Sequence, residues 1–291
     1  MANEYLKRTP TSTGNRRTWS FSFWVKRNSL AASAIFYTNQ TSQPYMSAGV
    51  FNANGSLQAV RNESATVTEL NSEAVFRDVG NWMNVLIAFD STDTIETRRT
   101  KLYVNGVLIP FNSSANYASL NYISAINRTV EHNIGIVVDT SGNKVIPLEA
   151  ELFDYFFVDG QVLTPDVFGF FKEGKGYQSS GTTESTDFRP GQWSPKAPRI
   201  IKSEINRRGG FGVNGFYLPM NDSSNFGADF HCAPNSIIKL KGEDLPQPRN
   251  GLPTTSDDYV SQLREDPYAA NLVLAVPGVN TQPTGSELVT N

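Results

Sequence analysis

Three acidic residues in one short run are the side chains best spaced for general acid–base chemistry. Glu149, Glu151 and Asp154 lie in the segment EAELFD. A retaining glycosidase needs two carboxyl groups about 5–5.5 Å apart, and an inverting one needs about 6.5–9.5 Å. In a strand, Glu149 and Glu151 share one face, but Asp154 falls on the other face unless a bulge intervenes. We therefore expect no catalytic residue here, and the protein is predicted not to be an enzyme.

The two histidines offer little nucleophilic or metal chemistry. His132 and His231 are far apart in the chain, and His231 directly precedes Cys232, the single cysteine. Neighbours in a strand point to opposite faces, which disfavours a Cys–His pair or a zinc site. We expect each histidine to be an ordinary core or surface residue.

Two turns carry the oxygen groups that calcium prefers, at 90–93 (DSTD) and at Asn221-Asp222. Acidic residues also simply stabilise turns, so calcium stays an open alternative and no ligand is assigned. The Gly-rich run at 207–212 lacks the strand and helix that flank a phosphate loop, which predicts a flexible loop. The basic pairs Arg16-Arg17 and Arg98-Arg99 are expected on solvated surface. We predict no catalytic, cofactor-binding or metal-binding residue.

Short strands separated by polar turns must position these side chains. The alternation from Trp19 to Val25 predicts a strand at 18–26 with one face in the core. The apolar run at 81–90 predicts a strand buried on both faces, and Asn105-Gly106 predicts a type I′ hairpin. Further strands are expected at 34–38, 46–51, 57–60, 133–139, 150–160 and 216–220, and a short helix is expected after Thr164-Pro165.

Trp24 raises a separate question, because it lies among serines on the second face of the 18–26 strand. Three explanations fit: cover by the 173–230 part of the chain, an interface with a neighbouring subunit, or a sugar-stacking platform. We favour cover by the chain's own arm. The inward-facing set is expected to pack with Trp82, Phe89 and either Phe156 or Phe157.

Composition disfavours nucleic-acid and membrane partners. The 291 residues include 25 basic and 28 acidic side chains, for a net charge of −3 without a strong basic field. No apolar run approaches the ~20 residues of a membrane helix, and the polar start MANEYLKRTP lacks the apolar core of a signal peptide. One cysteine permits no internal disulfide and fits synthesis in a reducing cytosol.

The domain organisation follows from these patterns. We predict an all-β fold with a two-sheet antiparallel sandwich over residues 1–230, including a loop-rich arm at 173–215. Residues 231–291 are expected to form an extended C-terminal tether, because the stretch at 241–258 is rich in proline and polar residues.

Four segments, in this order, resemble the laminin-G/concanavalin A-like jelly-roll domain. They are WSFSFWVKR, NWMNVLIAFD, KLYVNGVLI and LFDYFFVDGQVLTPDVFG. The resemblance implies a jelly-roll sandwich. Some relatives cleave glycans with an E-x-D-x-x-E strand, which the run at 149–154 resembles without matching. Relatives also often hold calcium at the rim of the sandwich.

A finer resemblance is to virion proteins of tailed bacteriophages, particularly tail-fibre-like proteins of cyanophages. It rests on YLKRTPTSTGNRRTWSFSFWVKR, VDGQVLTPDVFGFF and NGFYLPMNDSSNFGAD. It implies a virion structural protein, made in the host cytoplasm, that forms homo-oligomers, contacts other virion proteins and binds host-surface glycan. The alternative is a capsid-surface decoration or head-fibre protein, and a glycan-degrading enzyme is less favoured.

Overall fold

The computed structural model describes residues 5–38, 45–63, 68–139, 141–172, 192–221 and 225–231. All of them lie within Met1–His231, the first of two units into which the chain divides. The predicted tether, including 241–258, lies outside the described residues. None of the helices in the described ranges is long and apolar enough to cross a membrane.

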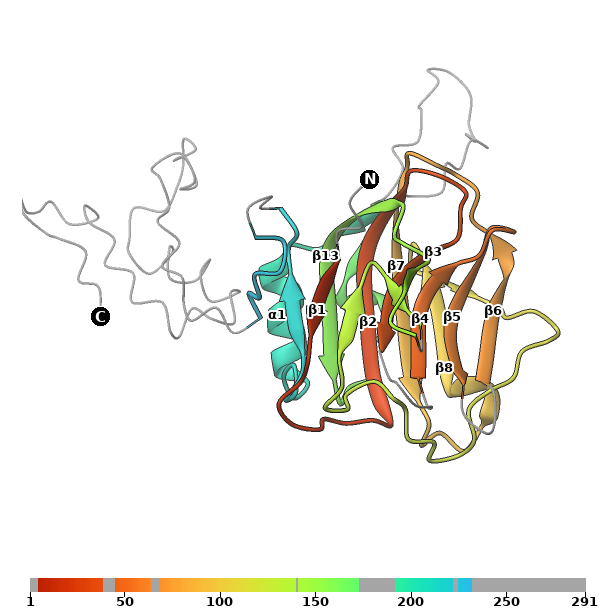
Figure 1. Ribbon diagram of the computed structural model, residues 1–291. Helices are drawn as coiled ribbons and strands as arrows, with labels where there is room; N and C mark the ends of the chain where they lie inside the picture. Colours follow the sequence, from red (N-terminus) through yellow and green to blue (C-terminus); the bar gives the residue numbers. More distant parts are fainter. Residues whose placement is uncertain are drawn as a thin grey trace, which may run out of the picture. The chain divides into compact units, whose positions relative to one another are not determined.

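Two six-stranded antiparallel sheets face each other (Figure 1). The β3 sheet has the spatial order β1 (Leu6–Arg8), β10 (His132–Ile134), β3 (Ser33–Thr38), β4 (Tyr45–Phe51), β5 (Ser56–Glu63) and β6 (Thr68–Val75). The β2 sheet has the order β16 (Phe216–Leu218), β13 (Ala150–Asp159), β2 (Thr18–Arg27), β7 (Trp82–Asp90), β8 (Thr100–Val104) and β9 (Val107–Ile109). The predicted all-β, two-sheet sandwich is confirmed.

Smaller elements complete the described chain. Two small antiparallel sheets pair β11 (Val137–Val138) with β12 (Lys144–Val145), and β14 (Gly169–Lys172) with β15 (Gln192–Pro195). The helices are η1 (Glu96–Arg98), η2 (Pro165–Val167) and α1 (Pro198–Arg207). The short helix predicted after Thr164-Pro165 is therefore confirmed as one 3-10 turn.

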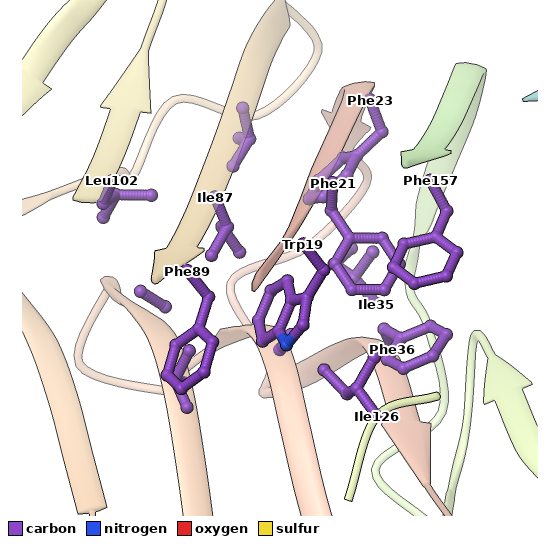
Figure 2. Close-up of a cluster of buried hydrophobic side chains, with 14 of the residues drawn as sticks. Trp19, Phe21, Phe23, Ile35, Phe36, Ile87, Phe89, Leu102, Ile126 and Phe157 are labelled. Carbon is purple, nitrogen blue, oxygen red and sulfur yellow. The ribbon is translucent and has the colours of Figure 1, made fainter. Parts of the chain in front are cut away.

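Aromatic side chains from β2 fill the space between the sheets, as the alternation predicts (Figure 2). Trp19 stacks on Phe89 with ring centroids 4.8 Å apart, and Phe21 stacks on Phe157 at 4.4 Å. The prediction that Trp82 joins this core is wrong. Trp82 pairs with Lys26 across the β2–β7 ladder, and this register places it on the outer face of the sheet.

A β-bulge in β13 keeps aromatic residues on both faces of that strand. The register to β2 shifts between Phe153 and Phe156, and Asp154 adopts a left-handed φ of 47°. The shift turns Tyr155 into the main core, where it stacks on Phe23 at 5.3 Å. Phe156 then faces outward into a second apolar cluster.

The predicted hairpin at Asn105-Gly106 is confirmed, since both residues have positive φ, 49° and 78°. Glycine is also required here by packing. A Cβ on Gly106 would lie 2.4 Å from the ring of Trp193 in β15. The absence of a side chain at Gly106 therefore leaves room for the ring of Trp193, which is distant in the sequence.

Helix α1 corrects the expectation of a loop over all of 173–215. It buries Ile201 and Ile205, which are one turn apart, in the same apolar cluster as Phe156 and Val158 from the outer face of β13. Helix α1 thus covers this part of the second face, but the predicted cover of Trp24 by the chain's own arm stays a prediction, because residues 173–191 lie outside the described residues. Trp24 itself stays partly exposed.

Candidate functional site

The three carboxylates of the 149–154 run have three different partners. Glu149 accepts a hydrogen bond from the Ser29 hydroxyl, and Glu151 forms a 2.8 Å ion pair with Lys26. Asp154 is buried and accepts a 2.5 Å hydrogen bond from the hydroxyl of Tyr217. Burial raises the pKa of Asp154, and the Tyr217 hydroxyl partly offsets this rise. This arrangement differs from two carboxyl groups that flank a common substrate.

Oxygen atoms of the turn at 90–93 accept hydrogen bonds from groups within the protein. Asp90 accepts hydrogen bonds from the amide and hydroxyl of Thr92, at 3.0 and 2.6 Å. The guanidinium of Arg99 donates to the carbonyls of Asp93 and Ala118, at 2.9 and 2.7 Å. The expectation of a solvated Arg99 is therefore wrong, because this side chain is buried under the turn. Asp222, of the second turn, lies outside the described residues.

Metal ligands do not gather elsewhere in the described ranges, where no group of three or more His, Cys, Asp or Glu side chains is placed to hold an ion. The Gly-rich run at 207–212 ends helix α1 instead of cradling phosphate. Gly209 and Gly210 have positive φ and donate to the carbonyls of Asn206 and Ile205. The predicted flexible loop is thus a helix C-cap.

Three aromatic side chains gather on the outer face of the β2 sheet, and we call Trp24, Trp82 and Phe153 the aromatic platform. Trp82 is 41% exposed and Phe153 is 38% exposed. Their ring centroids lie 6.3 Å apart at an interplanar angle of 67°. Trp24 pairs directly with Phe153 across the β2–β13 ladder. The three rings therefore come from three neighbouring strands, β7, β2 and β13.

Charged groups border the aromatic platform. Lys26 places its ammonium 5.4 Å from the ring of Trp82 and pairs with Glu151. The platform therefore offers ring faces together with a hydrogen-bond donor and an acceptor. The exposed parts of Trp82 and Phe153 amount to about 120–200 Å² together, taking about 150–250 Å² for each whole side chain. This area is far below the roughly 800 Å² that one partner contributes to a stable protein interface. It therefore suits a small ligand that has an apolar face and polar groups at its edge.

An apolar cavity of about 300 Å³ opens at the edge of the sandwich, and we call it the edge cavity. It lies where β1 and β10 of one sheet meet β16 of the other. Its lining is Leu6, Lys7, Arg8, Pro10, Phe36, Asn127, His132, Ile134, Phe157, Asn214, Phe216, Leu218, Gly227 and Asp229. No local pattern in the sequence predicts this cavity, because its walls come from segments that are far apart in the chain.

A buried polar network lies beside the edge cavity. Asp159 accepts hydrogen bonds from the amides of Asn15 and Asn214, at 2.7 and 3.1 Å, and from Nδ2 of Asn127 at 2.9 Å. Burial raises the pKa of Asp159, while the backbone amide donors pull this pKa down. The side chain holds the N-terminal segment and the loop before β16 against the end of β13.

His132 is buried in the lining of the edge cavity, as an ordinary core histidine. Nδ1 donates to the Val130 carbonyl at 2.6 Å, and Nε2 accepts from the Asn127 amide at 3.2 Å. Burial lowers the pKa of His132 from 6.5 to about 4, and nearby Arg8 adds to this effect. The folded protein therefore keeps the imidazole neutral.

We expect acid to destabilise the protein through His132. Between pH 6.5 and about 4, His132 is protonated in the unfolded chain but stays neutral in the folded protein. The free energy of unfolding therefore falls as the pH falls through this window. The loss amounts to about 3 kcal/mol, at 1.36 kcal/mol per unit. Urea unfolding at pH 7 and pH 4 measures this loss. The drop in the free energy of unfolding between the two pH values should be about 3 kcal/mol larger for the wild type than for His132→Gln. Parallel losses in the two proteins would contradict the assignment.

Comparison with known proteins finds one family model and several similar solved structures. Residues 2–127 match the model of a family described as the concanavalin A-like lectin/glucanases superfamily. A heptameric SAP-like pentraxin from Limulus polyphemus is 18% identical over 55% of this chain and 71% of its own, with a TM-score of 0.39. The CBM40 of Ruminococcus gnavus IT-sialidase, bound to α2,3-sialyllactose, is 14% identical over 55% of this chain and 95% of its own, with a TM-score of 0.36. No curated protein sequence matches the chain.

Proposed function

We propose that this chain, whose sandwich is of the concanavalin A-like type, is a non-catalytic bacteriophage virion protein. It would be a tail-fibre or tail-associated component that binds host-surface glycan through the aromatic platform. The platform is the observation that carries the binding role, because its rings lie partly exposed beside an ion pair. The face of a pyranose ring stacks on aromatic side chains, and its hydroxyls pair with charged groups at the edge.

Two further observations support the non-catalytic virion role. Glu149, Glu151 and Asp154 have separate partners, which leaves no carboxylate pair in the run where a glycosidase would carry one. Three sequence segments between positions 5 and 229 resemble phage virion proteins, and they follow one another in the same order. This resemblance supports attachment to a particle. Virion sites are symmetric, so the protein is proposed to act as a homo-oligomer beside other virion proteins.

Immunogold labelling of purified particles tests the virion role. An antibody raised against the whole chain should place gold at the tail. Gold spread over the head would replace the tail role with the capsid-decoration alternative. Particles without gold would refute the virion role and return the glycan-degrading enzyme to consideration.

Replacing Trp82 by alanine is expected to weaken glycan binding at least tenfold. The change removes about 100 Å² of exposed ring surface, worth roughly 2 kcal/mol when a sugar covers it. A glycan array followed by calorimetry on the best ligand would measure the loss. Phe226→Ala is the matched control, because Phe226 is an equally exposed aromatic residue that lies in the segment after β16, off the platform. Equal binding by both variants would exclude the platform.

A further inference from the structure

We propose that the edge cavity is a second binding site, for a small amphipathic anion with an apolar body and one acidic group. This inference is independent of the proposed glycan role, because the edge cavity and the aromatic platform share no residue. A cavity of about 300 Å³ lies at the lower end of the range for small-molecule sites. Apolar walls and one cationic side chain without an ion pair in the described ranges, that of Arg8, favour such a ligand.

The walls of the edge cavity come from both sheets and are mostly apolar. Phe36 and Ile134 belong to the β3 sheet, and Phe157, Phe216 and Leu218 belong to the β2 sheet. All five side chains are largely buried. The cavity thus continues the main core to the sandwich edge, and a ring or short chain placed there would remove apolar surface from water.

Most charged groups in the lining are paired. Lys7 forms an ion pair with Glu131 at 3.3 Å. Asp229 accepts hydrogen bonds from Nδ1 of His231 at 2.8 Å and from the amide of Tyr217 at 3.0 Å. These contacts engage the lysine ammonium and Oδ1 of the Asp229 carboxylate with partners inside the protein.

Arg8 is different, because it forms no ion pair within the described ranges. Its guanidinium donates to the Asn214 carbonyl at 3.1 Å and lies 5.8 Å from the ring centroid of Phe216. A guanidinium has five donors, so several remain for a carboxylate or sulfonate.

Fluorescence titration with 8-anilinonaphthalene-1-sulfonate tests the site on the full chain. This probe joins aromatic rings to one anionic group, and we expect saturable binding at one site per chain. Ile134→Phe, which fills the cavity, should abolish binding. Arg8→Gln should weaken it at least tenfold, because a hydrogen bond to a charged group is lost. Urea unfolding of each variant would verify that it folds.

Two controls separate the cavity from other surfaces. Arg17→Gln removes an exposed arginine that also donates to a backbone carbonyl, that of Asn121, away from the edge cavity, so it should leave binding unchanged. The uncharged analogue N-phenyl-1-naphthylamine should bind wild type and Arg8→Gln equally. Sulfonate binding that survives both Ile134→Phe and Arg8→Gln, or that falls in Trp82→Ala instead, would overturn the proposal.

Discussion

Replacing Asp159 by alanine is expected to lower the free energy of unfolding by about 4 kcal/mol. The carboxylate is buried and accepts hydrogen bonds from Asn15, Asn127 and Asn214. Alanine would leave these donors without an acceptor, at about 1–3 kcal/mol for each donor that stays buried. Urea unfolding at pH 7 measures the difference.

Two glycines from distant segments pack closely against Asp159. A Cβ on Gly14 would lie 2.1 Å from the Asp159 carboxylate, and one on Gly212 would lie 2.2 Å from its carbonyl oxygen. Gly212 also has a positive φ of 75°, which other residues rarely adopt. Two distant segments therefore fit against Asp159 only because they carry glycine at the contact.

Two variants make the Asp159 prediction specific. Asp159→Asn keeps one acceptor oxygen and should lose less stability than the alanine variant. Asp166→Ala removes a largely exposed carboxylate that is 3.6 Å from Arg208, and should cost under about 0.5 kcal/mol. A loss in Asp159→Ala as small as that in Asp166→Ala would show that the network contributes little.

The fold could be predicted from the sequence wherever the signal is local. Alternation in 18–26 and the pair Asn105-Gly106 each depend on a few consecutive residues, and both predictions are confirmed. The face of Trp82 could not be predicted in this way. A strand buried on both faces has no alternation, so only the register to β2 decides which side Trp82 takes.

Sites that combine segments far apart in the chain are harder to predict from the sequence than single strands and turns. The aromatic platform depends on the strand order β13–β2–β7, which brings Trp24, Trp82 and Phe153 together although they are far apart in the chain. The sequence allows a sugar-stacking role for Trp24 as one of three explanations, but it does not indicate that Trp82 and Phe153 lie beside this side chain. Helix α1 was missed because its apolar stripe is short, with Ile201 and Ile205 in a run rich in polar residues, glycine and proline.

Replacing Trp19 by alanine is expected to lower the free energy of unfolding by about 4–5 kcal/mol. Trp19 is fully buried at the centre of the main core (Figure 2). The substitution removes a large ring, at about 3–5 kcal/mol for Trp to Ala in a core. It also removes the stack on Phe89 and the edge contact with Phe21 at 5.4 Å. Urea unfolding again provides the measurement.

Trp19→Phe separates the ring contacts from the polar contact. Phenylalanine retains a ring against Phe89 but loses the 3.2 Å hydrogen bond from the indole Nε1 to the Ser124 hydroxyl. We expect a loss of about 1–2 kcal/mol, from a small cavity and one lost hydrogen bond, while the Ser124 hydroxyl still donates to the Ile126 carbonyl. Equal losses in the two variants would instead mean that the hydrogen bond to the 124 loop, and not stacking between the sheets, is what makes tryptophan necessary at the start of β2.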